Sequence, residues 1–175
     1  IGKWHNIEVE DDVTAYLQFE NGATGVFVTT TGDAPGTNRF EVTGTLGKLV
    51  CENDELTFWK LSEDEREFCR TAKEGFAKPP CEKITVETDG ENLQHVGVLN
   101  AFAGKILRGE PLVAEGCEGI NGLTLSNAMH LSSWLGHPVE IPFDEELFLS
   151  ELNKRRATSQ KKESKEITFS TEGTY

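Results

Sequence analysis

The sequence predicts an α+β fold, an open and mostly antiparallel β-sheet with helices packed on one face. The first half of the chain alternates apolar and polar residues in short runs separated by glycine and asparagine, which is typical of antiparallel strands. In the second half, apolar residues recur every three or four positions, which is typical of amphipathic helices. Because strands come first and helices follow, the order indicates an α+β organisation instead of a doubly wound nucleotide-binding fold.

A β-hairpin opens the first half. Residues 13–20 alternate with a period of two, and residues 24–30 are rich in β-branched and aromatic side chains. Between them, Asn21 and Gly22 both tolerate positive φ, so we expect a type I′ turn. Further strands are expected at 39–43, 48–52, 56–61 and 84–87, separated by Gly44, Gly47 and the pair Asn53-Asp54.

Three helices and one short strand are expected after residue 90. Helical spacing begins at Leu93 and ends at Gly109, and a second helix runs from near Cys117 to Gly136. Residues 139–143 look like a short strand. Asp144 is placed to cap a third helix that ends in the basic cluster 154–156.

Length and charge limit the possible functions. The 175 residues suit one domain, which we place at 1–156, followed by a polar and mobile tail at 157–175 with an optional edge strand at 167–170. A net charge of −13 argues against nucleic acid and anionic membranes as partners. There is no apolar run of roughly 18–20 residues and no secretory signal pattern, so we expect a cytoplasmic protein. Because the chain opens on Ile1, we expect a processed or excised segment of a longer protein.

Few residues suggest chemistry. The four cysteines, at 51, 69, 81 and 117, are widely spaced and are expected to be reduced packing residues, with no metal site. The glycines of 44–48 fit a tight turn between strands, so no dinucleotide fingerprint is present. His5, His130 and His137 are expected to be structural or surface residues, and the tryptophans to be packing residues instead of a carbohydrate platform. We interpret Glu82-Lys83 as two neighbouring, solvent-exposed residues on a strand.

The ordered set of patterns resembles the C-terminal domain of the Gfo/Idh/MocA family of NAD(P)-dependent sugar and polyol oxidoreductases. The resemblance covers about 9–152: a strand, Asn-Gly turn, strand and glycine-rich loop, then a helix from His95, the segment 108–111 (RGEP), a small-residue helix and the segment 139–142 (VEIP). It implies an α+β sheet domain whose nucleotide-binding half, with the catalytic residues, lies upstream. NAD or NADP would therefore serve the full-length enzyme and would not bind this fragment, which would be inactive alone.

The resemblance also directs attention to a candidate site. In the family, the segment that corresponds to 31–39 lies near the sugar or polyol pocket, so Thr37, Asn38 and Arg39 are candidate substrate-binding residues, with His95 as a fourth. The alternatives are an exposed loop with Arg39 paired on the sheet surface, and a local cap or buried hydrogen bond for His95. We expect a homodimer or higher homo-oligomer through the sheet face that carries Trp59. The competing function is a non-catalytic module that binds a protein or a glycan and shares only the fold.

Overall fold

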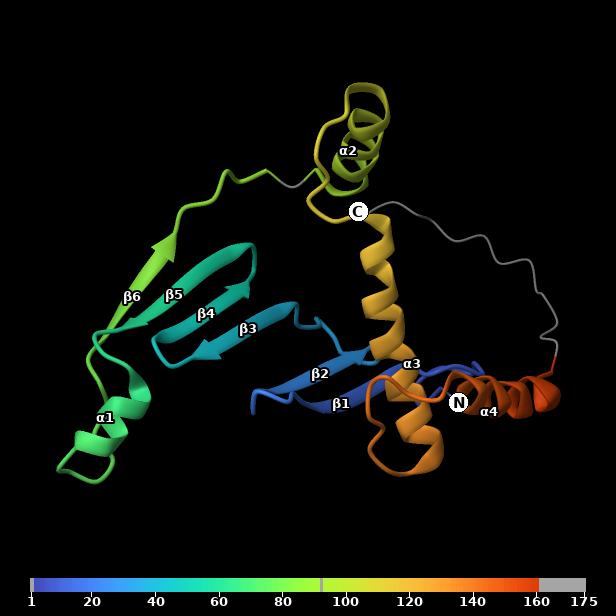
Figure 1. The fold of residues 1–175 in the computed structure, drawn as a ribbon, viewed down its shortest axis with the longest axis horizontal. Coiled ribbons are helices and arrows are strands. Elements are labelled where there is room, and N and C mark those ends of the chain that lie inside the picture. Colours follow the sequence, from blue (N-terminus) through green and yellow to red (C-terminus); the bar gives the residue numbers. More distant parts are fainter. Residues whose placement is uncertain (1, 92, 161–175) are drawn as a thin grey trace. The chain divides into compact units, whose positions relative to one another are not determined.

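The computed structural model describes residues 2–91 and 93–160 and confirms an α+β fold with antiparallel strands. The strands pair in two sheets, a hairpin of β1 and β2 and a four-stranded sheet in the order β3-β4-β5-β6 (Figure 1). Four α-helices and one short 3₁₀ helix complete the described part. The elements are β1 Asp12–Gln18, β2 Thr24–Thr30, β3 Arg39–Gly44, β4 Gly47–Glu52, β5 Glu55–Leu61, α1 Glu65–Thr71, β6 Cys81–Val86, α2 Gln94–Arg108, η1 Gly116–Glu118, α3 Gly119–Leu135 and α4 Glu145–Thr158.

The chain forms two compact units. Of the described residues, unit 1 contains 2–32 and 113–160, and unit 2 contains those from Asp33 to Leu112. Residues 1–156, predicted as one domain, are thus divided between the two units. The segment 31–38, between β2 and β3, contains the boundary.

The β1–β2 hairpin of unit 1 is confirmed, with Ala15 opposite Phe27. Val13, Ala15 and Leu17 are half-buried while the residues between them are exposed, as the period of two predicts. The predicted type I′ turn is wrong, because Gly22 has a φ of 82° but Asn21 does not have positive φ. The Gly22 amide donates to the Phe19 carbonyl and the Phe19 amide donates to the Ala23 carbonyl. This is the pattern of a three-residue hairpin loop that ends in a left-handed glycine.

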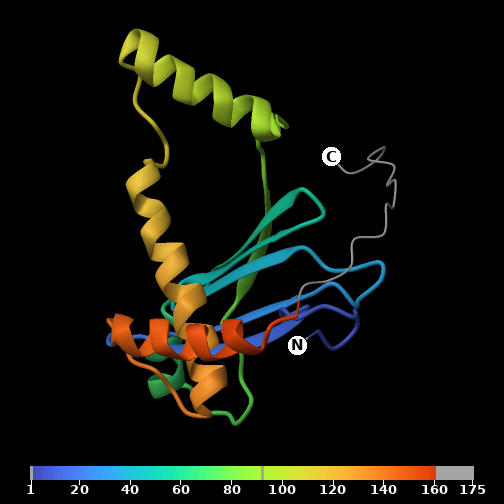
Figure 2. The ribbon, with the colours of Figure 1, turned by 90° about the vertical axis from the view of Figure 1, so that its right-hand side faces the viewer.

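Helices α3 and α4 lie beside the hairpin in unit 1 (Figures 1 and 2). Leu131 and Ala128 of α3 are buried and form the core of this unit. The Trp134 ring stacks on the Phe148 ring of α4, with the ring centres 5.5 Å apart. The Asp144 side chain accepts hydrogen bonds from the amides of residues 146 and 147, which confirms the predicted cap of α4.

Two predictions for the C-terminal half of the chain differ from the structure. The strand expected at 139–143 is wrong, since no strand is present there. Pro138, just before this segment, and Pro142, within it, lack the amide hydrogen that a strand donates to its neighbour. Helix α4 extends to Thr158, two residues into the expected tail. The remainder of that tail, with the optional strand at 167–170, lies outside the described residues.

The four strands of unit 2 form an antiparallel meander whose two faces differ in chemistry. Residues directly opposite each other in the sheet point to the same face, as do residues two apart on one strand. The register therefore defines a mostly apolar face, here called the apolar face, made by Phe40, Val42, Leu49, Cys51, Leu56, Phe58, Ile84 and Val86, with the charged residues Lys60 and Glu82 at one end. The polar face, on the other side, carries Arg39, Glu41, Thr43, Lys48, Val50, Glu52, Glu55, Thr57, Trp59, Leu61, Cys81, Lys83 and Thr85.

Turns and helices complete unit 2. A tight turn with positive φ at both central residues joins β4 to β5, at Asn53 and Asp54 with φ values of 53° and 60°. Helix α2 ends as predicted at Gly109, which has a φ of 70°. Helix α1 was not predicted from the sequence, although Asp64 caps it by accepting hydrogen bonds from the amides of Arg66 and Glu67. An aspartate followed three residues later by a glutamate resembles a capping box and was the available signal.

Candidate functional site

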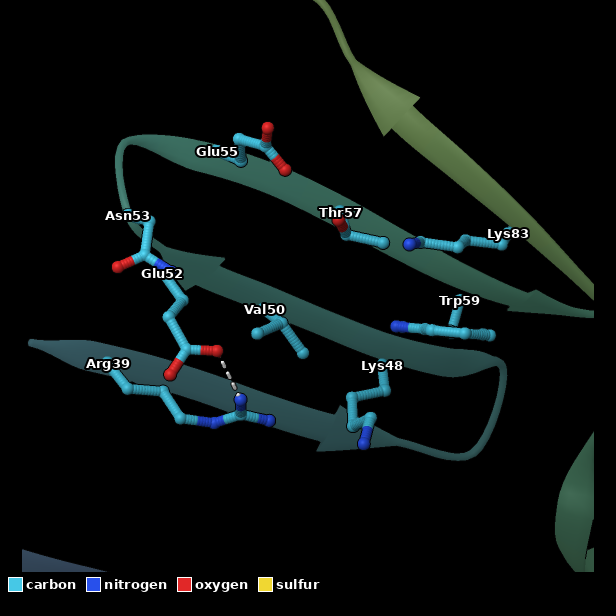
Figure 3. A pocket seen from close by; sticks show the side chains of 9 residues that line it. All are labelled: Arg39, Lys48, Val50, Glu52, Asn53, Glu55, Thr57, Trp59 and Lys83. Atoms are coloured by element: carbon cyan, nitrogen blue, oxygen red, sulfur yellow. Dashed lines mark hydrogen bonds and ion pairs between the residues drawn. The ribbon is translucent and has the colours of Figure 1, made fainter. Parts of the chain in front are cut away.

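A shallow pocket of about 290 Å³ lies on the polar face of the four-stranded sheet (Figure 3). Its floor is Val50, which is buried, and Thr57 beside it. Charged and polar side chains from all four strands and from one turn surround this floor. The lining residues are Arg39, Lys48, Val50, Glu52, Asn53, Glu55, Thr57, Trp59 and Lys83.

The sheet register arranges these side chains in rows that cross the strands. Lys48, Trp59 and Lys83 are direct neighbours on β4, β5 and β6 and form what we call the lysine row. Four residues away along β4, Arg39, Glu52 and Glu55 form a second row, here called the carboxylate row. The pocket floor lies between the two rows. One end of the pocket thus carries two ammonium groups, and the other carries two carboxylates and the guanidinium group of Arg39.

Ion pairs hold the β3–β4 side of the pocket. Arg39 Nη1 lies 2.6 Å from Glu52 Oε2, and the other terminal nitrogen of Arg39 contacts the Glu41 carboxylate. Lys48 Nζ lies 3.3 Å from Glu41 Oε1. Hydrogen bonding to Arg39, and secondarily to Lys48, outweighs desolvation and holds the pKa of the Glu41 carboxyl below its ordinary value. Glu41 therefore stays ionised and fixes both cations.

Trp59 provides the apolar wall of the pocket. Its side of the sheet is open, and the residue is 38% exposed. Lys83 Nζ lies 5.4 Å from the centre of the indole ring, within cation–π range. An exposed aromatic face beside an ammonium group suits a ligand with both an apolar face and a negative group.

The candidate residues from the sequence have different positions. Arg39, the first residue of β3, lines the pocket and is also paired on the sheet surface, as the alternative interpretation expected. Thr37 and Asn38 precede it in an exposed loop and do not line the pocket. His95 is the second residue of α2 and is exposed, not buried. A role for these residues in substrate binding stays a prediction.

Most of the pocket was missed from the sequence. From the sequence, Glu82 and Lys83 were expected to be solvent-exposed residues on a strand. Lys83 is on β6, as expected, but its side chain contacts the Trp59 ring. Trp59 was expected to be a packing residue. The available signal was the period of two: on β4 and β5, Lys48, Val50 and Glu52 share one face, as do Glu55 and Trp59.

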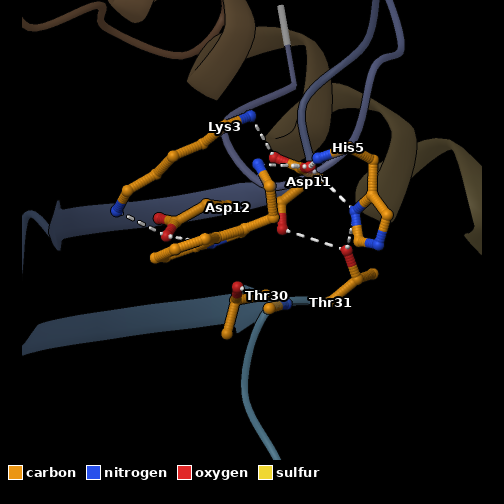
Figure 4. A network of polar contacts seen from close by, with 8 residues as sticks. Lys3, His5, Asp11, Asp12, Thr30 and Thr31 are labelled. Atoms are coloured by element: carbon orange, nitrogen blue, oxygen red, sulfur yellow. Dashed lines mark hydrogen bonds and ion pairs between the residues drawn. The ribbon is translucent and has the colours of Figure 1, made fainter.

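A second polar cluster, in unit 1, anchors the start of the 31–39 loop (Figure 4). The buried Asp11 carboxylate accepts hydrogen bonds from the amides of Lys3, Trp4 and His5 at 2.6, 2.9 and 2.7 Å, and from the His5 ring at 3.0 Å. Desolvation acts to raise the pKa of Asp11, but these four hydrogen bonds outweigh it and hold the pKa far below its ordinary value.

This cluster also fixes the chain where it leaves β2. The Thr31 amide donates to the Asp11 carbonyl at 2.9 Å, and the Thr31 hydroxyl lies 3.2 Å from His5 Nδ1. The Trp4 ring packs so closely on Gly32 that a Cβ there would overlap it. His5 thus has a structural role, as predicted. The loop that leads to Arg39 begins from a rigid point.

Other candidate chemistry has structural explanations. His137 Nδ1 donates to the Pro138 carbonyl at 2.8 Å, and His130 Nδ1 lies 3.5 Å from Glu10 Oε1. The four cysteines are free, but all are exposed, so the predicted packing role is wrong. Within the described ranges, no group of three or more His, Cys, Asp or Glu side chains is placed to hold a metal ion. No helix in that part of the chain is long and apolar enough to cross a membrane.

Comparison with known proteins identifies one part of the chain. Residues 2–50 match the family model of the GFO/IDH/MocA C-terminal domain. The matched segment contains β1, β2, β3 and β4 as far as Val50. The resemblance inferred from the sequence is therefore confirmed for this segment, which indicates a domain associated with oxidoreductases. No curated protein matches the chain.

Proposed function

We propose that this chain, whose residues 2–50 match the GFO/IDH/MocA C-terminal domain, is the substrate-binding and assembly domain of an NAD(P)-dependent oxidoreductase. The substrate class is a sugar, an inositol or a related polyol. One observation carries the proposal: Arg39, a candidate substrate residue within the matched segment, lines the pocket on the polar face. Its guanidinium group is fixed by Glu52 and Glu41, so it is held in place before any ligand arrives.

The cofactor in this proposal belongs to another part of the full-length protein. A dinucleotide site needs a glycine-rich turn between a strand and a helix. Gly44 and Gly47 instead pair across a tight turn between β3 and β4, so these residues do not fit a dinucleotide. Bound nicotinamide would supply the hydride chemistry, while this chain binds and orients the substrate. Titration of the chain with NAD(H) or NADP(H) in a calorimeter should give no saturable heat, and a micromolar isotherm would contradict this division of roles.

Kinetics of the full-length protein test the substrate role. Arg39→Ala and Asn38→Ala should raise KM for the sugar or polyol and leave the Kd for the nicotinamide nearly unchanged, because in this proposal these residues contact the substrate and the nucleotide is bound by another part of the protein. Arg70→Ala is the matched control, since Arg70 pairs with Glu67 on α1 and does not line the pocket. Unchanged kinetics in both test variants would remove the loop and β3 from the substrate site.

For assembly, we propose a homodimer through the apolar face of the four-stranded sheet. From the sequence we expected the dimer interface on the face that carries Trp59, but the register places Trp59 among the charged residues. On the apolar face, Phe40 is 70% exposed and Val42 is 49% exposed. Soluble proteins rarely leave such a contiguous apolar surface in water, and a second copy of standard interface size would cover about 1,600 Å² in total.

Light scattering at micromolar concentration tests this assembly. The chain should have the mass of a dimer, and Val42→Glu should convert it to a monomer without unfolding. Trp59→Glu, on the opposite face, is the control and should leave the dimer intact. A monomeric mass for the unmodified chain, or dissociation by Trp59→Glu alone, would refute assembly through the apolar face.

A second function is also supported by one observation. The exposed indole of Trp59 in a polar pocket is a feature of glycan-binding modules, so the domain would bind a glycan without any redox partner. Hydride transfer by the full-length protein separates the two functions. The oxidoreductase proposal requires it, and a non-catalytic module would show none.

A further inference from the structure

We propose that the pocket on the polar face binds an anionic sugar, with the carboxylate or phosphate of the ligand at the lysine row. The inference rests on the proposed function only in taking a sugar as the ligand body. The negative group and its position follow from the charges and the register of unit 2.

The lysine row is a local concentration of positive charge in an acidic chain. Lys48 and Lys83 are neighbours of Trp59 on either side, in a protein whose net charge is −13. Lys83 forms no ion pair within the described residues, and its ammonium group lies over the indole. An anion at this row would gain the ammonium group of Lys83 and would share that of Lys48 with Glu41. The cost of desolvating the ammonium groups is small because the pocket is open to water.

The carboxylate row suits the hydroxyl end of the same ligand. Arg39 is already engaged by Glu41 and Glu52, so its charge is compensated. The Glu55 carboxylate makes no hydrogen bond to any residue that the structure describes, so it is able to accept hydrogen bonds from sugar hydroxyls. A second negative group at this end would be repelled by both glutamates. The pocket therefore orients an anionic sugar in one direction.

The volume of the pocket suits a small ligand. The two rows are four residues apart along β4, which corresponds to about 14 Å of backbone at the usual rise of a strand, so the long side chains of the rows would have to extend over the floor to contact both ends of one sugar. The volume of about 290 Å³ is at the lower limit of small-molecule pockets. Val50, between the rows, and the Trp59 ring of the lysine row offer an apolar surface for the C–H face of a sugar ring.

Calorimetry on the chain tests the inference with five probes: glucuronate, glucose 6-phosphate, glucose, acetate and inorganic phosphate, all at one ionic strength. Glucuronate, glucose 6-phosphate or both should bind saturably, and the tighter of the two identifies the anion as carboxylate or phosphate. Glucose, acetate and inorganic phosphate should each bind at least about tenfold more weakly, the loss expected when a charged hydrogen bond or the ring contact is absent.

Charge-removing variants locate the site. Lys83→Gln and Lys48→Gln should each weaken binding of the anionic sugar about tenfold, whereas Lys78→Gln, outside the pocket, should not change it. Glucose binding as tightly as glucuronate would overturn the requirement for an anion. Simple anions binding as tightly as the sugars, or no binding by any probe, would overturn the site itself. These results are distinguishable from a failure of the oxidoreductase function, which is tested separately by hydride transfer in the full-length protein.

Discussion

Leu131 is the most deeply buried large side chain of unit 1, with an exposed fraction of 1%. Leu131→Ala removes a buried side chain and leaves a cavity, so the free energy of unfolding should fall by about 2–5 kcal/mol. Leu123→Ala makes the same chemical change on the same helix at a position that is 55% exposed. Because most of the Leu123 side chain is already in water, that variant should lose less than about 1 kcal/mol.

Urea unfolding, monitored through hydrogen exchange of the α3 amides, measures the loss of unfolding free energy in both variants within unit 1. This readout reports local opening of α3 and does not require the two units to unfold together. The midpoint for Leu131→Ala should fall with little change in the urea dependence. Equal losses in the two variants, or no loss for Leu131→Ala, would refute the assignment of the unit 1 core to the buried face of α3.

Three further predictions concern local structure. Because the folded pKa of Asp11 is depressed, its contribution to stability is present above its ordinary pKa of 3.8 and is lost as pH falls below that value. Asp11→Asn should therefore flatten the acid side of the curve of stability against pH, while the control Asp33→Asn, at an exposed position, should not. Parallel curves for Asp11→Asn and the unmodified chain would argue against the amide cluster. Gly32→Ala should displace the Trp4 ring and shift tryptophan fluorescence to longer wavelength, whereas an unchanged spectrum would contradict the close contact. Asp144→Ala should destabilise α4 by about 1 kcal/mol in thermal unfolding, and an unchanged melting temperature would exclude the cap.

Much of the fold was predictable because the hydrophobic period and the residues that end helices and strands are local properties of the sequence. In the part of the chain that the structure describes, six strands and three of the four α-helices were recognised from alternation, helical spacing and terminal glycines. Turn geometry was harder. Asn21-Gly22 has the preferred composition for a type I′ turn, yet both central residues have positive φ at Asn53-Asp54 instead. Backbone hydrogen bonds at residues 19 and 23 decide the first turn, and composition does not reveal them.

The candidate site was less predictable because it depends on strand register. Arg39 was recognised through the family resemblance, but Lys48, Trp59 and Lys83 are far apart in the sequence and meet only through pairing of β4, β5 and β6. A one-residue shift in register would place Trp59 on the other face. The same dependence explains why the assembly surface was first expected on the Trp59 side.

Hydride transfer by the full-length protein tests the central claim most directly. The protein should be incubated with NAD⁺ or NADP⁺ and a panel of sugars, inositols and sugar acids, and the absorbance of reduced nicotinamide followed. We predict reduction of the nicotinamide that depends on one class of polyhydroxylated substrate. The KM for that substrate should rise in Arg39→Ala. Absence of reduction with every substrate, in a protein shown to bind the nicotinamide, would contradict it.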